Sequence, residues 1–115
     1  QHGGSLMIMN MAVIKQLSPQ EAFALSQQGV LLVDVREADE VAQKRYQVAN
    51  YLHLPLSQLA ETYEQLPTDQ PLIIACLSGG RSQKAIAFLQ AKGYDDLSNL
   101  DGGIKAWEAQ GLPVV

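Results

Sequence analysis

The only cysteine of this chain stands at the start of a loop that could hold an anion. The loop reads Cys76-Leu77-Ser78-Gly79-Gly80-Arg81-Ser82 and lies between an apolar run and a pattern typical of a helix. Two adjacent glycines let the backbone adopt positive φ, so that successive N–H groups can face one point. The positive end of the following helix would lie at the same place. We therefore expect a ring of backbone donors that favours the Cys76 thiolate and could hold a further anionic sulfur or oxygen.

Two further features of the loop bear on its chemistry. Arg81 adds a fixed positive charge, and its planar fork suits the oxyanion of a substrate. A lone cysteine among 115 residues excludes an internal disulfide, a CxxC metal site and an internal dithiol couple. A cysteine can also be just a small buried apolar residue. The strand-end position and the Gly-Gly-Arg-Ser sequence that follows favour the nucleophile over that alternative.

The elements that must position this loop alternate between strands and helices. Residues 30–35 and 72–75 are continuous apolar runs, typical of strands buried on both faces of a parallel sheet. Ser18-Pro19-Gln20-Glu21 predicts the start of a helix that Gly29 ends. We also expect helices over 37–43, 57–66, 82–92 and 104–110, and weaker strands over 11–15, 51–54 and 96–99. This order predicts an α/β fold, with a mostly parallel central sheet and helices on both faces.

In such sheets the ligand lies beyond the carboxyl ends of the strands. That rule selects the Cys76 to Arg81 loop, and also Asp34 and Arg36 at the end of the other buried strand. Asp34 and Arg36 could line the pocket, but we favour a structural ion pair. We expect His53 to be a structural imidazole and Trp107 to pack its helix onto the sheet, and Asp101 could cap the last helix.

Composition narrows the class of protein. The chain has 8 Lys+Arg against 12 Asp+Glu, a net charge of -4, and no basic cluster longer than Lys44-Arg45. Nucleic acid is therefore a poor candidate for a partner. No apolar run approaches the roughly 18 residues that a membrane span needs. Residues 6–14 lack the features of a signal peptide, so we expect a cytoplasmic protein without membrane contact.

Length predicts one domain, since roughly 150 residues per domain is usual. We interpret residues 1–10 as an expression scar with an N-terminal extension, because Gln1 to Ser5 precede the first methionine, Met7. The domain itself would then cover residues 11–115.

Over those residues the chain resembles the single-domain rhodaneses, a family of sulfurtransferases. Four motifs carry the resemblance, and in this sequence they are Leu32-Val33-Asp34-Val35-Arg36-Glu37, Leu52-His53-Leu54-Pro55-Leu56, the Cys76 to Ser82 loop, and Leu100-Asp101-Gly102-Gly103-Ile104-Lys105-Ala106-Trp107 with Gly111-Leu112-Pro113. The resemblance implies a rhodanese-like domain with its active-site loop at the carboxyl end of a strand. It implies no metal and no cofactor.

The resemblance also implies a reaction. Cys76 would take a sulfane sulfur from a small anionic donor, such as thiosulfate or another persulfide-type compound, and become a persulfide. The outer sulfur would pass to cyanide or to a thiol, which could belong to an acceptor protein. The N–H groups of Leu77 to Ser82 would stabilise the persulfide, and Arg81 would bind the donor. A second thiol would discharge a persulfide as a disulfide, so a lone cysteine suits this intermediate.

The sequence departs from the family pattern at two places, and two alternative functions remain. Ser78 stands where some relatives carry a basic residue that contacts thiosulfate, which argues against a strong preference for that donor. Residues 44–49 replace the usual Gly-His-Ile segment, so no role is carried over to them. One alternative is a non-catalytic rhodanese-like module that binds a protein. The other is a cysteine-dependent phosphatase or arsenate reductase, although those enzymes typically place five residues between cysteine and arginine, and here there are four.

Overall fold

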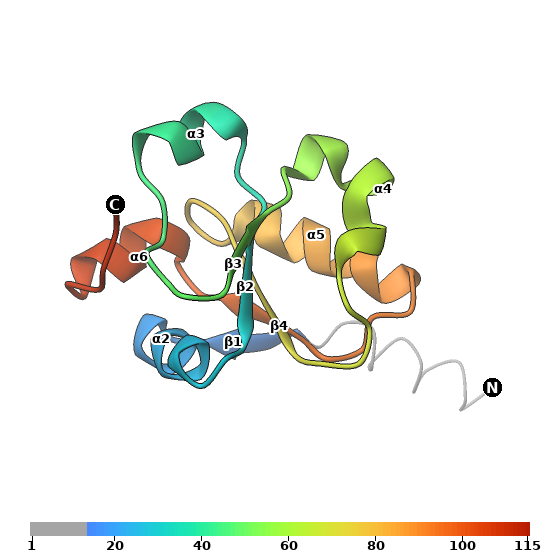
Figure 1. Ribbon diagram of the computed structural model, residues 1–115, viewed down its shortest axis with the longest axis horizontal. Helices are drawn as coiled ribbons and strands as arrows, with labels where there is room; N and C mark the ends of the chain where they lie inside the picture. The colour runs from blue at the N-terminus through green and yellow to red at the C-terminus, as the bar shows by residue number, and fades with distance from the viewer. Residues whose placement is uncertain (1–13) are drawn as a thin grey trace.

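A parallel sheet of five strands organises the computed structural model, which describes residues 14–115 (Figure 1). The prediction for residues 1–10 and most of the strand predicted over 11–15 lie outside the described residues. The strands are β1 (Lys15–Leu17), β2 (Leu31–Asp34), β3 (Tyr51–His53), β4 (Leu72–Ala75) and β5 (Leu97–Leu100). They lie in the order β1-β5-β4-β2-β3, with every adjacent pair parallel. The predicted α/β fold is confirmed.

Helices cover both faces of the sheet, as expected. They are α2 (Pro19–Gln27), α3 (Ala38–Gln43), α4 (Leu59–Thr62), α5 (Gly80–Ala91) and α6 (Gly103–Ala109), with short 3₁₀ turns η1 (Leu56–Gln58) and η2 (Tyr63–Gln65). In Figure 1, α4 and α5 lie on one side of the sheet, α2 and α6 on the other. Helix α3 lies beyond the end of β2, near the carboxyl edge. No helix among residues 14–115 is both long and apolar enough to cross a bilayer; the cytoplasmic location stays a prediction.

The central strand β4 shows how the sheet separates two cores. Leu72, Ile74 and Cys76 pack on the side of α5, while Ile73 and Ala75 pack on the side of α6. This alternation is the two-residue period of a strand. All four residues of β4 are buried because helices cover both faces, which is why the run reads as continuously apolar. Cys76 therefore leaves the sheet on the α5 side.

The start of α2 agrees with its sequence signal. Ser18 Oγ accepts the N–H of Glu21 at 3.1 Å, and Glu21 Oε1 accepts the N–H of Ser18 at 2.8 Å. This is the reciprocal capping box that Ser18 and Glu21 predict.

Three local predictions were wrong. The helix predicted over 57–66 is divided into η1, α4 and η2, and Ser57 does not cap it because its hydroxyl donates to Glu37 at 2.6 Å. The interrupted path brings Leu59 and Leu66 into the core beside α5. Helix α5 begins at Gly80, earlier than the predicted residue 82, and Gly79 is its N-cap. Asp101 does not cap α6: the N-cap is Gly102, and Asp101 is exposed.

Candidate active site

The loop after β4 curls around the sulfur of Cys76. Gly79 has a φ of 106°, and its N–H donates to Cys76 Sγ at 3.1 Å. Ser82 Oγ lies 3.4 Å from the same sulfur. Of the two loop glycines only Gly79 has a positive φ, because Gly80 already belongs to the helix. The loop therefore places one backbone N–H and one hydroxyl at the sulfur with a single left-handed residue, and the wider ring of donors stays a prediction.

The surroundings favour the thiolate. Burial is the largest single influence and by itself raises the pKa of Cys76. The Ser82 hydroxyl and the backbone N–H groups of Ser82, Gly79 and Ser78 oppose it, because hydrogen bonds to a charged sulfur stabilise that form. Together they hold the pKa of the Cys76 thiol below its ordinary value. A lowered thiol pKa is typical of reactive cysteines.

The carbonyl groups at the start of the loop are bonded to other elements. Cys76 O accepts the N–H of Ile104 at 2.9 Å, and Leu77 O accepts the N–H of Lys105 at 3.2 Å. Tyr46 also donates its hydroxyl to Cys76 O at 2.7 Å. Burial, above all, raises the pKa of Tyr46, so this hydroxyl stays protonated and remains a donor. These bonds to α6 and Tyr46 occupy both carbonyl oxygens and hold the start of the loop in place.

Gly103 lets α6 approach the loop so closely. Its φ is 59°, and a Cβ at this position would lie 2.4 Å from the carbonyl carbon of Leu77 and 2.6 Å from Cys76 O. Those atoms are backbone and cannot swing aside as a flexible side chain can. The Gly102-Gly103 motif near the end of the chain therefore builds the active-site loop from outside.

Arg81 is held by α3. Its Nη1 and Nη2 donate to the two carboxylate oxygens of Glu40 at 2.6 and 2.7 Å. These hydrogen bonds lower the pKa of Glu40 to about 2. Both terminal nitrogens of Arg81 are thus already bonded, and its expected contact with an anionic donor stays a prediction. Sequence reasoning assigned Glu40 only to a predicted helix, so it missed this pairing.

Asp34 and Arg36 form the expected structural pair. Arg36 Nη2 lies 2.8 Å from Asp34 Oδ2, and both side chains are almost completely buried. The remaining partners complete a closed network: Tyr51 donates to Asp34 at 2.7 Å, and Arg36 donates to Lys44 O at 2.9 Å. His53 Nε2 lies 2.7 Å from Arg36 O, which agrees with the structural role predicted for it.

A hollow of about 330 Å³ borders the loop between α3 and α6. The lining residues are Arg36, Glu40, Gln43, Lys44, Leu77, Ile104, Lys105 and Glu108. Arg36 thus supports the wall of a pocket next to the loop, as well as the end of β2. Among residues 14–115, no cluster of three His, Cys, Asp or Glu side chains is arranged to hold a metal ion.

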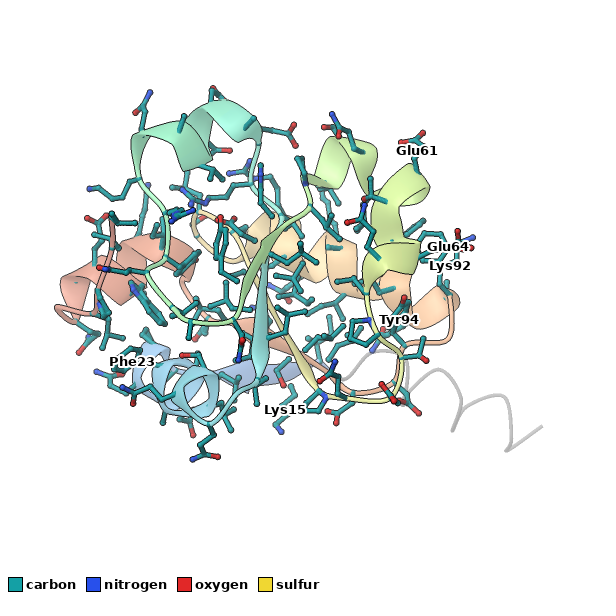
Figure 2. All side chains as sticks on the ribbon, in the orientation of Figure 1. Lys15, Phe23, Glu61, Glu64, Lys92 and Tyr94 are labelled. Carbon is teal, nitrogen blue, oxygen red and sulfur yellow. The ribbon has the colours of Figure 1, made fainter. Side chains whose placement is uncertain are left out.

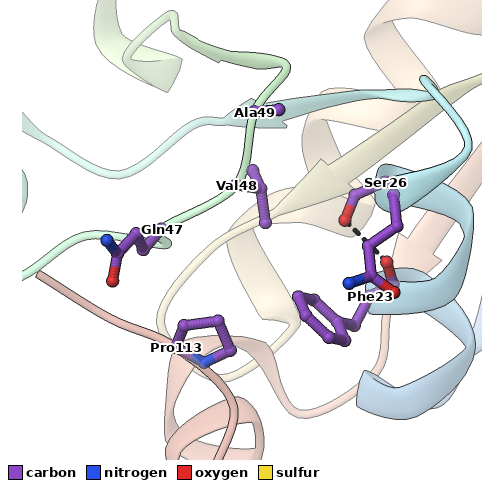
Figure 3. Close-up of a pocket in the computed structure, with 7 residues that line it drawn as sticks. Phe23, Ser26, Gln47, Val48, Ala49 and Pro113 are labelled. Atoms are coloured by element: carbon purple, nitrogen blue, oxygen red, sulfur yellow. Dashed lines mark hydrogen bonds between the residues drawn. The ribbon is translucent and has the colours of Figure 1, made fainter.

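Two other hollows lie away from the loop. One, of about 400 Å³, is lined by α2, residues 47–49 and Pro113, and Figure 3 shows Phe23 and Val48 on its walls. The other contains Glu64, Lys92 and Tyr94, which Figure 2 places together at the end of the molecule where α4 meets the end of α5. Neither includes a residue of the Cys76 loop.

Trp107 has the role predicted for it. Its side chain is fully buried in the core between α6 and the sheet, and its indole N–H donates to Pro113 O at 2.8 Å. Three contributors to the site had no recognised signal of their own, namely Glu40, Tyr46 and the backbone of α6. Gly103 was noted in the sequence only as part of the motif from Leu100 to Trp107.

Comparison with known proteins identifies the family. A model described as "Rhodanese-like domain" matches residues 18–110. The thiosulfate sulfurtransferase GlpE of Pseudomonas savastanoi pv. phaseolicola is 34% identical over 99 residues, 86% of this chain and 92% of that protein. A sulfurtransferase of Allochromatium vinosum is 42% identical over 86 residues, 75% of this chain and 78% of that protein.

A solved structure agrees with these sequence matches. The polysulfide-sulfur transferase homodimer from Wolinella succinogenes has a TM-score of 0.79 and 28% identity, covering 96% of this chain and 85% of that one. The chain belongs to the rhodanese-like domain family. Within that family it is a rhodanese-type sulfurtransferase, an enzyme that moves sulfur from a donor to an acceptor.

Proposed function

We propose that the enzyme transfers a sulfane sulfur through a persulfide on Cys76, from thiosulfate or another persulfide-type donor to cyanide or a thiol. The observation that carries this proposal is the pair of donor groups that the loop places at a single sulfur. Gly79 N–H and the Ser82 hydroxyl contact Sγ, and the neighbouring N–H groups help to stabilise its anionic form. A persulfide is also anionic near neutral pH, so the same groups suit both states.

The proposed reaction has two displacements. In the first, the Cys76 thiolate attacks the sulfane sulfur of thiosulfate, a new S–S bond forms, and sulfite leaves with the electron pair of the broken bond. In the second, cyanide or an acceptor thiolate attacks the outer sulfur of the persulfide. The S–S bond breaks, the electron pair returns to Cys76, and thiocyanate or a new persulfide is released. No net oxidation or added reductant is needed.

Two features of the chain support a persulfide as the intermediate. The sequence holds no second cysteine that could attack the loaded sulfur within the same molecule. Cys76 is also only 1% exposed, which protects the persulfide from chance encounters with other thiols. The same burial means that the loop must yield to an incoming donor. The hollow of about 330 Å³ beside Leu77 offers space next to that loop.

The donor is less narrowly defined than the nucleophile. Ser78 brings no positive charge to the loop, and Glu40 already neutralises Arg81. Both observations argue for donors other than the thiosulfate dianion as good substrates. A thiol persulfide, with less charge near the reacting sulfur, depends less on such cations.

Mass spectrometry of the loaded protein tests the proposal. Incubation with thiosulfate, polysulfide or glutathione persulfide should add the mass of one sulfur atom, and the Cys76→Ser variant should gain none. Cyanide should then remove the added mass and release thiocyanate. If none of the three donors changes the mass, the persulfide mechanism is wrong.

A parallel assay tests the alternative that the protein is a phosphatase or an arsenate reductase. The same preparations would be offered an aryl phosphate and arsenate. Phosphate release or arsenate reduction that depends on Cys76, without any sulfur loading, would favour the phosphatase or arsenate reductase. Loading without a transferable sulfur would instead indicate a non-catalytic module.

A further inference from the structure

A buried line of polar side chains runs from the Cys76 sulfur to the edge of the sheet. Ser82 Oγ lies 3.4 Å from Cys76 Sγ and is also hydrogen-bonded to Asn99 Oδ1. Asn99, in β5, donates its Nδ2 to Gln16 Oε1 in β1 at 2.7 Å. Ser82 and Asn99 are both fully buried, so water does not replace these partners. None of the steps proposed above uses Asn99.

The Ser82 hydroxyl has more acceptors than it can serve. It carries one proton, whereas Cys76 Sγ, Asn99 Oδ1 and Gly79 O, at 3.0 Å, all lie within hydrogen-bond distance. When Cys76 is a thiol, its S–H donates to Ser82 Oγ, and Ser82 can donate onward to Asn99. When Cys76 is a thiolate, the sulfur can only accept. Ser82 must then turn its proton to the sulfur and leave Asn99 Oδ1 without that donor.

We propose that Asn99 is a positioning residue that competes with the Cys76 thiolate for the single hydroxyl proton of Ser82 and thereby holds back ionisation of the thiol. The thiol proton itself leaves to solvent, and only the direction of the Ser82 O–H bond changes. A buried carbonyl oxygen deprived of its donor costs free energy, so Asn99 stabilises the thiol state relative to the thiolate. Ser82 has the opposite effect, because it donates to the charged sulfur.

This competition matters for a sulfur carrier. A very acidic thiol is a poor nucleophile for the first displacement, although it is a good leaving group in the second. A thiol whose pKa lies near ambient pH serves both steps. The inference rests on the proposed function for this benefit, but the ionisation it describes does not require sulfur transfer.

Other titratable and charged groups around the loop stay unchanged when Asn99 is replaced. They are Arg81 on α5, Glu37 and Glu40 at α3, Tyr46, the Asp34–Arg36 pair, His53, and Lys105 on α6. Their influence on Cys76 is therefore common to all variants.

The test measures the pH dependence of Cys76 alkylation by iodoacetamide in the full chain, where the lone cysteine makes the label specific. Asn99→Leu removes the amide at similar size, and should increase the thiolate fraction about threefold at a pH below the midpoint. Ser82→Ala should decrease it roughly tenfold, because a hydrogen bond to the charged sulfur is lost. In the Ser82→Ala background, Asn99→Leu should have no further effect, since the proton for which it competes is absent.

Three variants serve as controls. Asn99→Asp keeps an acceptor oxygen and should not increase the thiolate fraction. Ser98→Ala, the neighbouring residue on the same strand, should leave the profile unchanged. If Asn99→Leu does not fold, Gln16→Ala at the exposed end of the line should give a smaller increase, because Asn99 loses the partner that orients it.

The sign of the change distinguishes this inference from a merely structural role. A loosened loop would lose donors to the sulfur, so the thiolate fraction would fall in Asn99→Leu. A fall, no change, or an increase that persists in the Ser82→Ala background would overturn the inference. If the expected shifts appear but no donor loads Cys76, the proposed function fails while the competition for the Ser82 proton stands.

Discussion

The carboxyl ends of β2 and β4 lie side by side in the sheet, with Asp34 paired to Ala75, yet they serve different purposes. At the end of β2, two charged side chains bind each other and their neighbours, and the network is closed. At the end of β4, the Gly79 N–H and the Ser82 hydroxyl face one sulfur, while the first two loop carbonyls are bonded to α6. Charge at a strand end is therefore a poor guide to chemistry. Donors turned toward one atom are a better one.

The largest expected effect comes from breaking the closed network after β2. Arg36→Met would leave Asp34 ionised and buried without its cation, which should lower the free energy of unfolding by about 3–5 kcal/mol. Urea unfolding would measure the loss. Neither side chain contacts the sulfur but Arg36 lines the hollow beside the loop, so sulfur loading per folded molecule should be reduced only modestly.

The double variant Asp34→Leu with Arg36→Met sharpens that result. It removes both charges, so it should be more stable than Arg36→Met alone. A loss below about 1 kcal/mol in the single variant would show that the pair is not the structural element we describe.

Gly103→Ala should lower the free energy of unfolding less than Arg36→Met does, but it should slow sulfur loading more. The added Cβ would lie 2.4 Å from the Leu77 carbonyl carbon, at a φ that disfavours alanine. The loop and α6 must separate, so sulfur loading should slow at least tenfold and the free energy of unfolding should fall by about 1–3 kcal/mol. Mass spectrometry of loading reactions quenched at successive times would measure the rate of loading, and urea unfolding would measure the free energy of unfolding.

Gly80→Ala is the matched control for that variant. A Cβ at Gly80 would meet no described atom within 4 Å, and the residue has an ordinary helical conformation in α5. Because alanine favours helices, we expect unchanged loading and up to about 1 kcal/mol of added stability. Equal damage from both substitutions would contradict the role of Gly103.

The smallest effect concerns Glu40, which joins the two regions by reaching from α3 to Arg81. Its pKa is lowered from 4.5 to about 2 in the folded protein, so the pair stabilises the fold above pH 4.5 and is lost as pH falls toward 2. Glu40→Gln should therefore be less stable than the natural protein by up to about 1 kcal/mol at pH 7, since both side chains are partly exposed. The difference should vanish near pH 2.

Unfolding at a series of pH values would measure that dependence. A difference between the two proteins that stays constant from pH 7 to pH 2 would exclude the ion pair as its cause. Lys44→Gln provides a comparison, because Lys44 forms a more exposed pair with Glu108.

The sequence predicted the fold well because the fold depends on local signals, and the prediction of Cys76 as the nucleophile rests on local signals too. The apolar run 72–75 and the capping box at Ser18 determine their elements through neighbouring residues alone. Cys76 was found because a strand, a glycine turn and a helix follow one another along the chain. Local signals did not reveal the division of residues 57–66, nor the hydrogen bond of Ser57 to Glu37, which lies 20 positions away.

The rest of the site depends on contacts between distant parts of the chain. Asn99 reaches Ser82 across 17 positions, Tyr46 reaches Cys76 across 30, and Arg81 reaches Glu40 across 41. No spacing rule predicts such pairs. Glu40 and Tyr46 look like ordinary surface or core residues until the sheet brings them beside the loop.

The bonds from α6 to the loop have a consequence for how the enzyme is made. A chain is synthesised from its N-terminus, so Cys76 is made well before the residues of α6 whose N–H groups bind the loop carbonyls. Until Ile104 and Lys105 reach the loop, Cys76 O and Leu77 O are free to turn toward the sulfur. It follows that the loop around Cys76 gains its full set of backbone contacts only after synthesis has passed α6.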